Sequence, residues 1–192
     1  MKPLLFTKLR EVKSPNRANS GDAGIDFYIP KINFHDLMAV GQTENKMGIN
    51  LKLYEAGKLI LVKNEVGNDE YTKIGIKPGA RILIPSGIRV LIDPKDSMLM
   101  AANKSGVATQ TGLVYTAEIV DSPYTGEVHI GILNTTDEVV VIDLIVNCKI
   151  MQFIHVPVIL STPVEITTEQ YEGLAKDWGT RGSAGFGSSD NK

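Results

Sequence analysis

Short apolar runs separated by glycine- and proline-containing turns dominate the second half of the chain. They include Arg81–Pro85, Ile88–Ile92, Ser97–Ala101 and Val139–Ile145, and Ser86-Gly87 separates the first two. Runs of this length bounded by turn residues are typical of β-strands, and a series of them favours a sandwich or a barrel. Helical periodicity is almost absent from this region. The pattern therefore predicts an all-β fold.

The stretch from Ala117 to Asn134 has the clearest strand pattern and predicts two strands around a tight turn. Apolar residues recur at every second position of its second half, at Val128, Ile130 and Ile132. The turn between the strands, Ser122–Gly126, combines a proline that fixes φ with a glycine that tolerates positive φ. Asp121 and Tyr124 then lie at the mouth of a hairpin, where they suit a base and a planar ligand. An aspartate beside a Ser-Pro turn is also a common turn former, so this stretch alone leaves both readings open.

Two segments of the first half carry further signals. Leu4–Val12 alternates as a first strand, and Asp22–Pro30 brings two carboxylates and two small residues into the next strand. Acidic groups suit a hard cation such as Mg²⁺, directly or through water, although Asp-Ala-Gly is also ordinary turn chemistry. Residues 33–74 predict an ordered insertion, in which Leu51–Tyr54 and Lys58–Lys63 form a candidate hairpin.

One short helix is expected within Asn103–Gly112, with Ser105 as its N-cap. Lys104 beside a helix start would form an anion site, because free backbone amides and the helix dipole favour phosphate. The glycine-rich tail carries Arg181, suited to bidentate phosphate contacts, and Phe186, suited to covering a base. We expect this arm, residues 177–192, to be mobile when empty and ordered by ligand.

Composition narrows the class of protein. The chain has 192 residues, 43% of them hydrophobic, which fits a single domain with a substantial core. A net charge of −2 predicts no polycationic face, so we expect neither stable nucleic-acid binding nor membrane association. One cysteine, Cys148, no leader peptide and no long apolar span predict a cytoplasmic protein.

Five segments together resemble the motifs of the trimeric dUTPase family (dUTP nucleotidohydrolases), and they occur in the family's order. These segments are Asp22–Tyr28, Lys104–Ala108, Glu118–Glu127, Asn147–Gln152 and Arg181–Ser189. The resemblance runs from about Leu4 to Ser189 and excludes the insertion. It implies a distorted jelly-roll β-barrel of the β-clip type, assembled as a homotrimer with exchanged C-terminal arms.

The resemblance also implies roles for individual residues. Asp121 matches the carboxylate that activates the attacking water, and Tyr124 matches the aromatic residue that stacks on the deoxyribose. The backbone around Ala117 and Glu118 matches the edge that reads uracil. The matched phosphate-site residues are Lys104, Ser105, Gly106 and Gln152, and the matched tail residues are Arg181, Phe186, Gly187 and Ser188. Asp26 matches the acidic residue that orients water on Mg²⁺, the metal itself being held mainly by the triphosphate.

The chain departs from the family pattern at several positions. Lys104 replaces the usual arginine of the second motif and so loses its fork geometry. Glu118 stands where a glycine is expected, Pro123 where an acidic residue is expected, and Asn147-Cys148 where a Gly-Asp pair is expected. These changes bear on substrate affinity and base selectivity more than on the reaction class.

Two other functions are alternatives to dUTP hydrolysis. A dCTP deaminase shares the fold but carries a glutamate that shuttles protons on the strand after the turn, where this chain has Gly131. A regulatory protein on a degenerate dUTPase core would use the 33–74 insertion to bind a protein partner. The presence of Asp121, Tyr124 and Gln152 favours retained catalysis.

Overall fold

The computed structural model describes residues 3–30, 59–63, 71–143 and 148–178. The chain divides into two compact units, Met1–Ile159 and Leu160–Lys192. In the first unit the elements are β1 (Leu5–Lys8), β2 (Gly24–Phe27), β3 (Leu59–Lys63), β4 (Tyr71–Ile76), β5 (Arg81–Leu91), β6 (Ser97–Asn103), α3 (Ser105–Thr111), β7 (Leu113–Tyr115), β8 (Ile119–Asp121), β9 (Glu127–Asn134), β10 (Val140–Asp143) and β11 (Met151–Pro157). The second unit contains α4 (Thr168–Trp178). The prediction of an all-β fold is confirmed.

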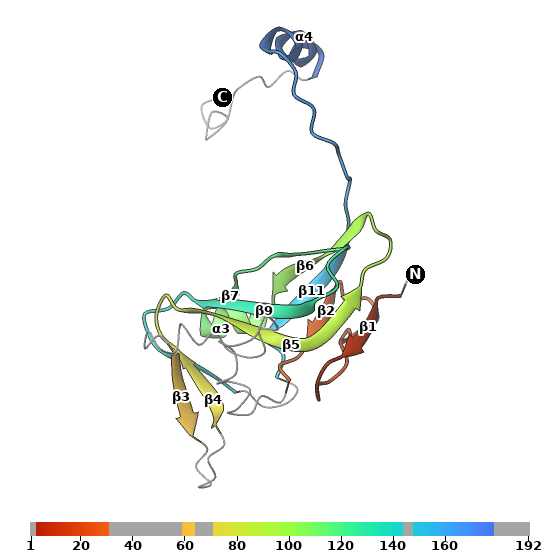
Figure 1. Ribbon diagram of the computed structural model, residues 1–192. Coiled ribbons are helices and arrows are strands. Elements are labelled where there is room, and N and C mark those ends of the chain that lie inside the picture. The colour runs from red at the N-terminus through yellow and green to blue at the C-terminus, as the bar shows by residue number, and fades with distance from the viewer. Residues whose placement is uncertain (1–2, 31–58, 64–70, 144–147, 179–192) are drawn as a thin grey trace. The chain divides into compact units, whose positions relative to one another are not determined.

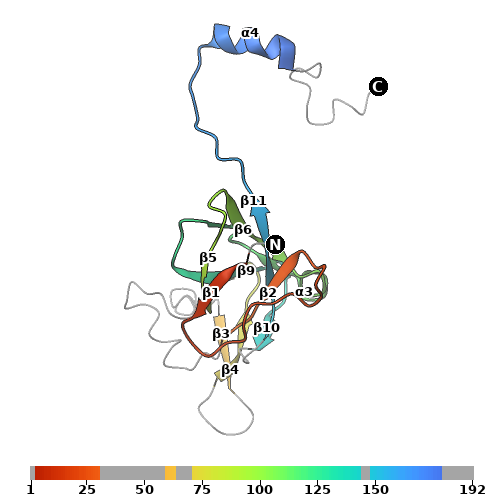
Figure 2. The same ribbon diagram turned by 90° about the vertical axis from the view of Figure 1, so that its right-hand side faces the viewer.

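The described strands of the first unit form three antiparallel sheets (Figures 1 and 2). Their strand orders are β1-β5-β9-β7, β2-β11-β6-β8 and β10-β4-β3. Strands distant in sequence are neighbours in each sheet, as where β11 lies between β2 and β6. This arrangement brings the second and fourth predicted motifs against the first.

The core lies between the inner faces of these sheets and is rich in isoleucine. Its fully buried side chains include Phe27, Ile84, Leu99, Ile130 and Phe153. The rings of Phe27 and Phe153 are tilted by 60° with their centroids 4.7 Å apart, a favourable aromatic geometry. Alternate residues of β9 and β11 supply this core, as their period-two pattern predicts.

The two short strands predicted on either side of Ser86-Gly87 are one continuous strand, β5. The pairing of β5 with β9 shifts register between Pro85 and Arg89, so a bulge replaces the predicted turn. Gly87 lies in this bulge with φ +72°, a backbone conformation open chiefly to glycine. A Ser-Gly pair therefore bends this strand without ending it.

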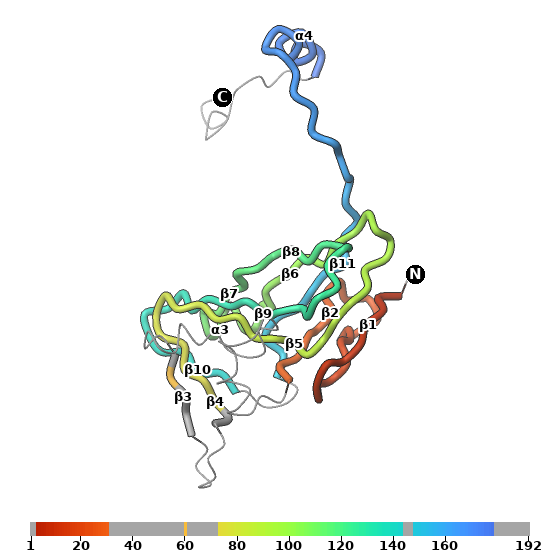
Figure 3. Tube along the Cα trace, viewed as in Figure 1, coloured from red at the N-terminus to blue at the C-terminus, as the bar shows by residue number. Residues whose placement is uncertain are grey.

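The strands predicted as a hairpin around Ser122–Gly126 do not pair with each other. β8 pairs with β6, as Figure 3 shows, whereas β9 pairs with β5 and β7. The chain therefore leaves the sheet of β7 after Tyr115, joins the edge of the other sheet as β8, and returns to the first sheet as β9. The turn is present, but the two strands separate instead of closing a ladder.

Little of the predicted insertion is described. Leu51–Tyr54, the first strand of the candidate hairpin, lies outside the described residues, whereas the second corresponds to β3, which pairs with β4. β4 also pairs with β10, and Ile74 is fully buried in the core although residue 74 was taken as the end of the insertion. The extent and order of the insertion stay predictions.

The second unit contains a helix that the sequence reading treated only as a polar segment. Thr167 and Gln170 form a reciprocal cap at its start, because each backbone amide donates to the other's side-chain oxygen, at 2.9 and 3.3 Å. Tyr171, Leu174 and Trp178 are all exposed. Within the described part of the chain, no helix combines the length and apolarity needed to cross a bilayer.

Candidate functional site

Asp121 ends β8 at the start of the turn between the two sheets. Its carbonyl oxygen accepts the backbone amide of Tyr124 at 3.0 Å, which closes the turn around Ser122-Pro123. The Ser122 hydroxyl donates to the carbonyl of Lys95 at 2.7 Å and ties the turn to the neighbouring loop. The Asp121 side chain is exposed, so water has access to this carboxylate.

Tyr124 is held by a hydrogen bond from its hydroxyl and by close packing against Gly126. Its hydroxyl donates to the carbonyl oxygen of Glu127 at 2.9 Å. A Cβ placed on Gly126 would lie 2.5 Å from the ring, so glycine alone leaves space for the ring here. The side chain is nevertheless 44% exposed, which leaves one face available to a ligand.

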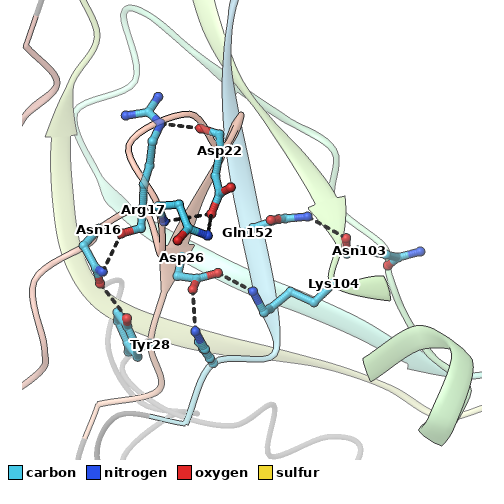
Figure 4. Close-up of polar contacts among 10 residues, drawn as sticks. Asn16, Arg17, Asp22, Asp26, Tyr28, Asn103, Lys104 and Gln152 are labelled. Carbon is cyan, nitrogen blue, oxygen red and sulfur yellow. Dashed lines mark hydrogen bonds and ion pairs between the residues drawn. The ribbon is translucent and has the colours of Figure 1, made fainter. Parts of the chain in front are cut away.

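Asp26 is the centre of a charged cluster drawn in Figure 4. Its side chain is 3% exposed, and its two oxygens accept from the ammonium groups of Lys104, at 2.5 Å, and Lys149, at 2.9 Å. Burial alone would raise the pKa of Asp26, but hydrogen bonds and charge from the two lysines outweigh it and hold this pKa below its ordinary value. The hydrogen bond to Asp26 in turn raises the pKa of Lys149. This carboxylate is therefore ionised and doubly paired.

Gln152 lies beside this cluster on β11, directly opposite Asp26 on β2. Its side-chain amide donates to the carbonyl of Asn103 at 2.9 Å (Figure 4). The Asn103 side chain in turn accepts the backbone amide of Tyr115. A Cβ on Gly24 would fall 2.0 Å from the Gln152 side-chain oxygen. The small residue in the first motif thus makes room for the glutamine of the fourth.

Ser105 is the first residue of α3, and Lys104 occupies the N-cap position without a side-chain cap bond. The prediction of Ser105 as N-cap was therefore wrong by one residue. Ser105 and Gly106 are exposed, and a Cβ on Gly106 would meet nothing within 4 Å. Gly112 ends the helix with φ +67° and its amide bonds the carbonyl of Ala108.

The register of one sheet separates the predicted base from the predicted phosphate residues. Gln152 pairs with Ala102 on β6, whereas Asp121 pairs with Met98. Four residues along a strand correspond to about 13 Å. Ala117 and Glu118 lie between these rows, and the Glu118 carbonyl accepts the Ala101 amide at 2.6 Å. Within one chain, therefore, Asp121 does not meet the Asp26 cluster.

The remaining predicted residues, Arg181, Phe186, Gly187 and Ser188, lie outside the described residues. Within the described ranges, no three histidine, cysteine, aspartate or glutamate side chains converge as a metal site. Asp26 also does not fit its predicted contact with metal-bound water, because the carboxylate is buried and both its oxygens already accept from lysines. Mg²⁺ would have to be held by another group, such as the substrate's phosphates.

The sequence profile of the dUTPase family matches residues 70–190, which include the second, third, fourth and fifth predicted motifs. This chain belongs to the dUTPase family. A relative from Mycolicibacterium vanbaalenii, a deoxyuridine 5'-triphosphate nucleotidohydrolase, is 28% identical over 182 residues, covering 94% of this chain and 89% of the relative. The match therefore spans both units and the segment taken as an insertion.

Solved structures confirm the predicted dUTPase-type fold. A mutant dUTPase of phage 80alpha superposes with a TM-score of 0.60 at 19% identity, covering 97% of this chain and 98% of that one. A mutant dUTPase of phage phi11 of S. aureus has a TM-score of 0.55 at 16% identity, covering 87% of this chain and 97% of that one. The phi11 structure is described as coordinating a structural Mg(II) ion.

Two residues of the cluster were missed by the sequence reading. Lys149 lies inside the fourth motif but was passed over for Gln152, and Asn103 immediately precedes the second motif. The available sequence signal was that Lys149 is a cation within a family motif, as Lys104 is within another. Its contact with Asp26 depends on β11 lying beside β2, which no local pattern shows.

Proposed function

We propose that this chain hydrolyses dUTP to dUMP and pyrophosphate in the cytoplasm, limiting uracil in DNA and supplying dUMP for dTTP synthesis. The observation that supports this most strongly is the third motif, which lies within the family match. There an exposed carboxylate, Asp121, begins a turn whose aromatic residue, Tyr124, is packed on Gly126.

Asp121 is proposed as the general base that takes a proton from the attacking water. A positioned base of this kind typically contributes about 10²–10⁴-fold to the rate. Tyr124 would stack on the deoxyribose and disfavour a 2′-hydroxyl. The Thr116 amide donates to the carbonyl of Gly131 on β9, and the chain separates from β9 after this residue. The backbone of Ala117 and Glu118 would then bind uracil beside β9.

The triphosphate needs its charge neutralised and its α-phosphorus held in line with water. We assign the α- and β-phosphates to Lys104, Ser105, Gly106 and Gln152. The arm residues Arg181, Phe186, Gly187 and Ser188 would close over the γ-phosphate and the base. Mg²⁺ bound to the triphosphate would supply further neutralising charge.

A homotrimer with exchanged arms would solve the separation within one chain. The strand register places Asp121 about 13 Å along the sheet from the Gln152 row. A neighbouring copy would contribute the missing half of the site, with the C-terminal arm of one subunit closing over another's pocket. Substrate would then bind between subunits.

The direct test measures pyrophosphate release from dUTP, dCTP, dTTP and UTP in parallel, with the nucleotide product identified. We expect release from dUTP alone, giving dUMP. Asp121→Asn should abolish turnover while sparing nucleotide binding. Turnover by this variant would show that the base is assigned wrongly. In a second variant, truncation before Trp178 should leave little activity.

Sharing of the site between copies is tested by complementation. Asp121→Asn and Lys104→Gln chains are each expected to be inactive, and mixed trimers formed by refolding them together should regain part of the activity. Some sites in such trimers combine an intact Asp121 with an intact Lys104. An inactive mixture, with mixed trimers verified by a different affinity tag on each variant, would mean that each chain builds its own site.

The dCTP deaminase alternative is disfavoured at Gly131. Glycine cannot transfer a proton, and a Cβ there would fall 2.6 Å from the Thr116 hydroxyl oxygen, so a side chain would fit only if Thr116 moved. Formation of dUTP from dCTP in the same assay would reverse this assignment. A protein partner at the 33–74 insertion stays a separate prediction.

A further inference from the structure

Lys149 has no assigned part in binding, yet it is placed like Lys104. Each lysine donates to one oxygen of Asp26, and the three residues come from or immediately adjoin the neighbouring strands β2, β11 and β6. An ammonium group has three donors. In the described part of the chain, each of these two groups has only one hydrogen-bond acceptor, so donors remain for a ligand.

The cluster also carries a net positive charge. Two ammonium groups around one carboxylate leave a charge of +1, and the lysine side chains are 22% and 44% exposed while Asp26 is 3% exposed. The negative charge is therefore buried behind the positive ones. Gln152 is the cross-strand partner of Asp26, and Lys104 directly precedes α3, so the cluster adjoins the proposed phosphate site.

We infer that Lys149 is a second phosphate-binding cation and that Asp26 is the buried counter-ion that positions both lysines, in place of a partner for metal-bound water. This inference rests on the proposed function, because it names further residues of the same phosphate site. It explains why Asp26 has both oxygens occupied.

The test uses inorganic tripolyphosphate as the probe, which contains the phosphates without the base or sugar. Its binding to the full-length chain would be measured by calorimetry in EDTA for wild type, Lys149→Gln, Lys149→Arg and the control Lys77→Gln, an exposed turn lysine. Loss of one charge-assisted hydrogen bond should weaken binding about tenfold in Lys149→Gln. Lys149→Arg should retain most of the affinity, and Lys77→Gln should match wild type.

Equal affinity of Lys149→Gln and wild type would overturn the inference, because a purely structural lysine changes stability but not phosphate affinity. A comparable loss in Lys77→Gln would also overturn it, since the effect would then be general surface charge. Failure of the proposed function is separable. If the chain does not turn over dUTP but its tripolyphosphate binding depends on Lys149, only the proposed function is refuted. If turnover is normal but tripolyphosphate binding does not depend on Lys149, only this inference is refuted.

The part assigned to Asp26 has its own measurement. In Asp26→Asn, the Mg²⁺ concentration for half-maximal binding of a non-hydrolysable dUTP analogue should be unchanged, while tripolyphosphate binding in EDTA changes with the loosened lysines. Removing a residue that supports metal-bound water usually costs about tenfold or more in metal affinity. An increase of that size would return Asp26 to the metal. If this variant does not fold, the Lys149 series still decides the inference.

Discussion

The ion pair between Arg10 and Glu127 should be among the largest single contributions to stability near the site. The guanidinium donates to one Glu127 oxygen at 3.2 Å, and the other oxygen accepts the backbone amide of Gly87 at 2.6 Å. The two side chains are only 11% and 10% exposed. One carboxylate thus joins the segment after β1, the bulge of β5 and the start of β9.

Glu127→Ala removes this carboxylate and leaves the arginine charge in a nearly buried position. Removing one partner of a buried pair costs about 3–5 kcal/mol. For a chain of this size, that corresponds to a decrease in Tm of roughly 10 °C. The double variant Arg10→Met/Glu127→Leu should cost less than the sum of the single variants, because both charges of the pair are removed together.

Urea unfolding followed by circular dichroism measures these free energies. Protein concentration must be equal in all samples, because an oligomer's midpoint depends on it. Glu138→Ala, which removes an exposed glutamate, is the matched control and should change stability little. A cost below about 1 kcal/mol for Glu127→Ala, the range of an exposed pair, would refute the reasoning.

Three further predictions concern individual contacts. Gly24→Ala should raise KM for dUTP with little change in the urea midpoint, because its Cβ displaces only the flexible end of Gln152; an unchanged KM would remove Gln152 from substrate binding. The pKa of Asp26 is lowered in the folded state, so its pairing stabilises the fold above the ordinary value of 3.8, and this contribution is lost as pH falls further through the folded-state pKa. The stability difference between wild type and Asp26→Asn should therefore shrink in acid titrations below that value, and a constant difference would contradict it. Asn134→Ala should destabilise the fold by about 3 kcal/mol in urea unfolding, because its buried amide donates to two carbonyls, including that of Ile76 at 2.8 Å, and these lose their partner; a near-zero cost would show that water replaces the amide.

Local strand patterns were readable from the sequence because the period of two records which face is buried. Val128, Ile130 and Ile132 were expected on one face of a strand, and all three are buried in β9. Pairing was not readable in the same way. The proximity of Ile119–Asp121 to Glu127–Asn134 in sequence predicted a hairpin, but the former pairs with β6. The Ser122–Gly126 turn changes the direction of the chain, but packing in the core determines which strand each of the two flanking strands pairs with.

The errors at Ser105 and Ser86-Gly87 have different physical causes. Helix ends are set by backbone geometry within one or two residues, and Lys104 occupies the extended N-cap position although serine is the better capping residue. At Gly87, positive φ serves either a turn or a bulge, and the continuing apolar pattern after it was the signal for a bulge. Both errors left the positions of the charged residues nearly unchanged.

The Asp26 cluster shows why a matched motif does not by itself assign a residue's chemistry. The family pattern placed Asp26 near metal-bound water, but that role requires an oxygen open to solvent. In this chain the oxygens are occupied because Lys149 adjoins β11 and Lys104 follows β6, on either side of the same carboxylate. Since a buried carboxylate between two lysines is stable only while both remain charged and close, the substrate's phosphates would meet a preformed cationic surface. A metal would then arrive with the triphosphate and need no protein carboxylate to hold it. The Lys149 and Asp26 variants distinguish this arrangement from one in which Asp26 supports metal-bound water.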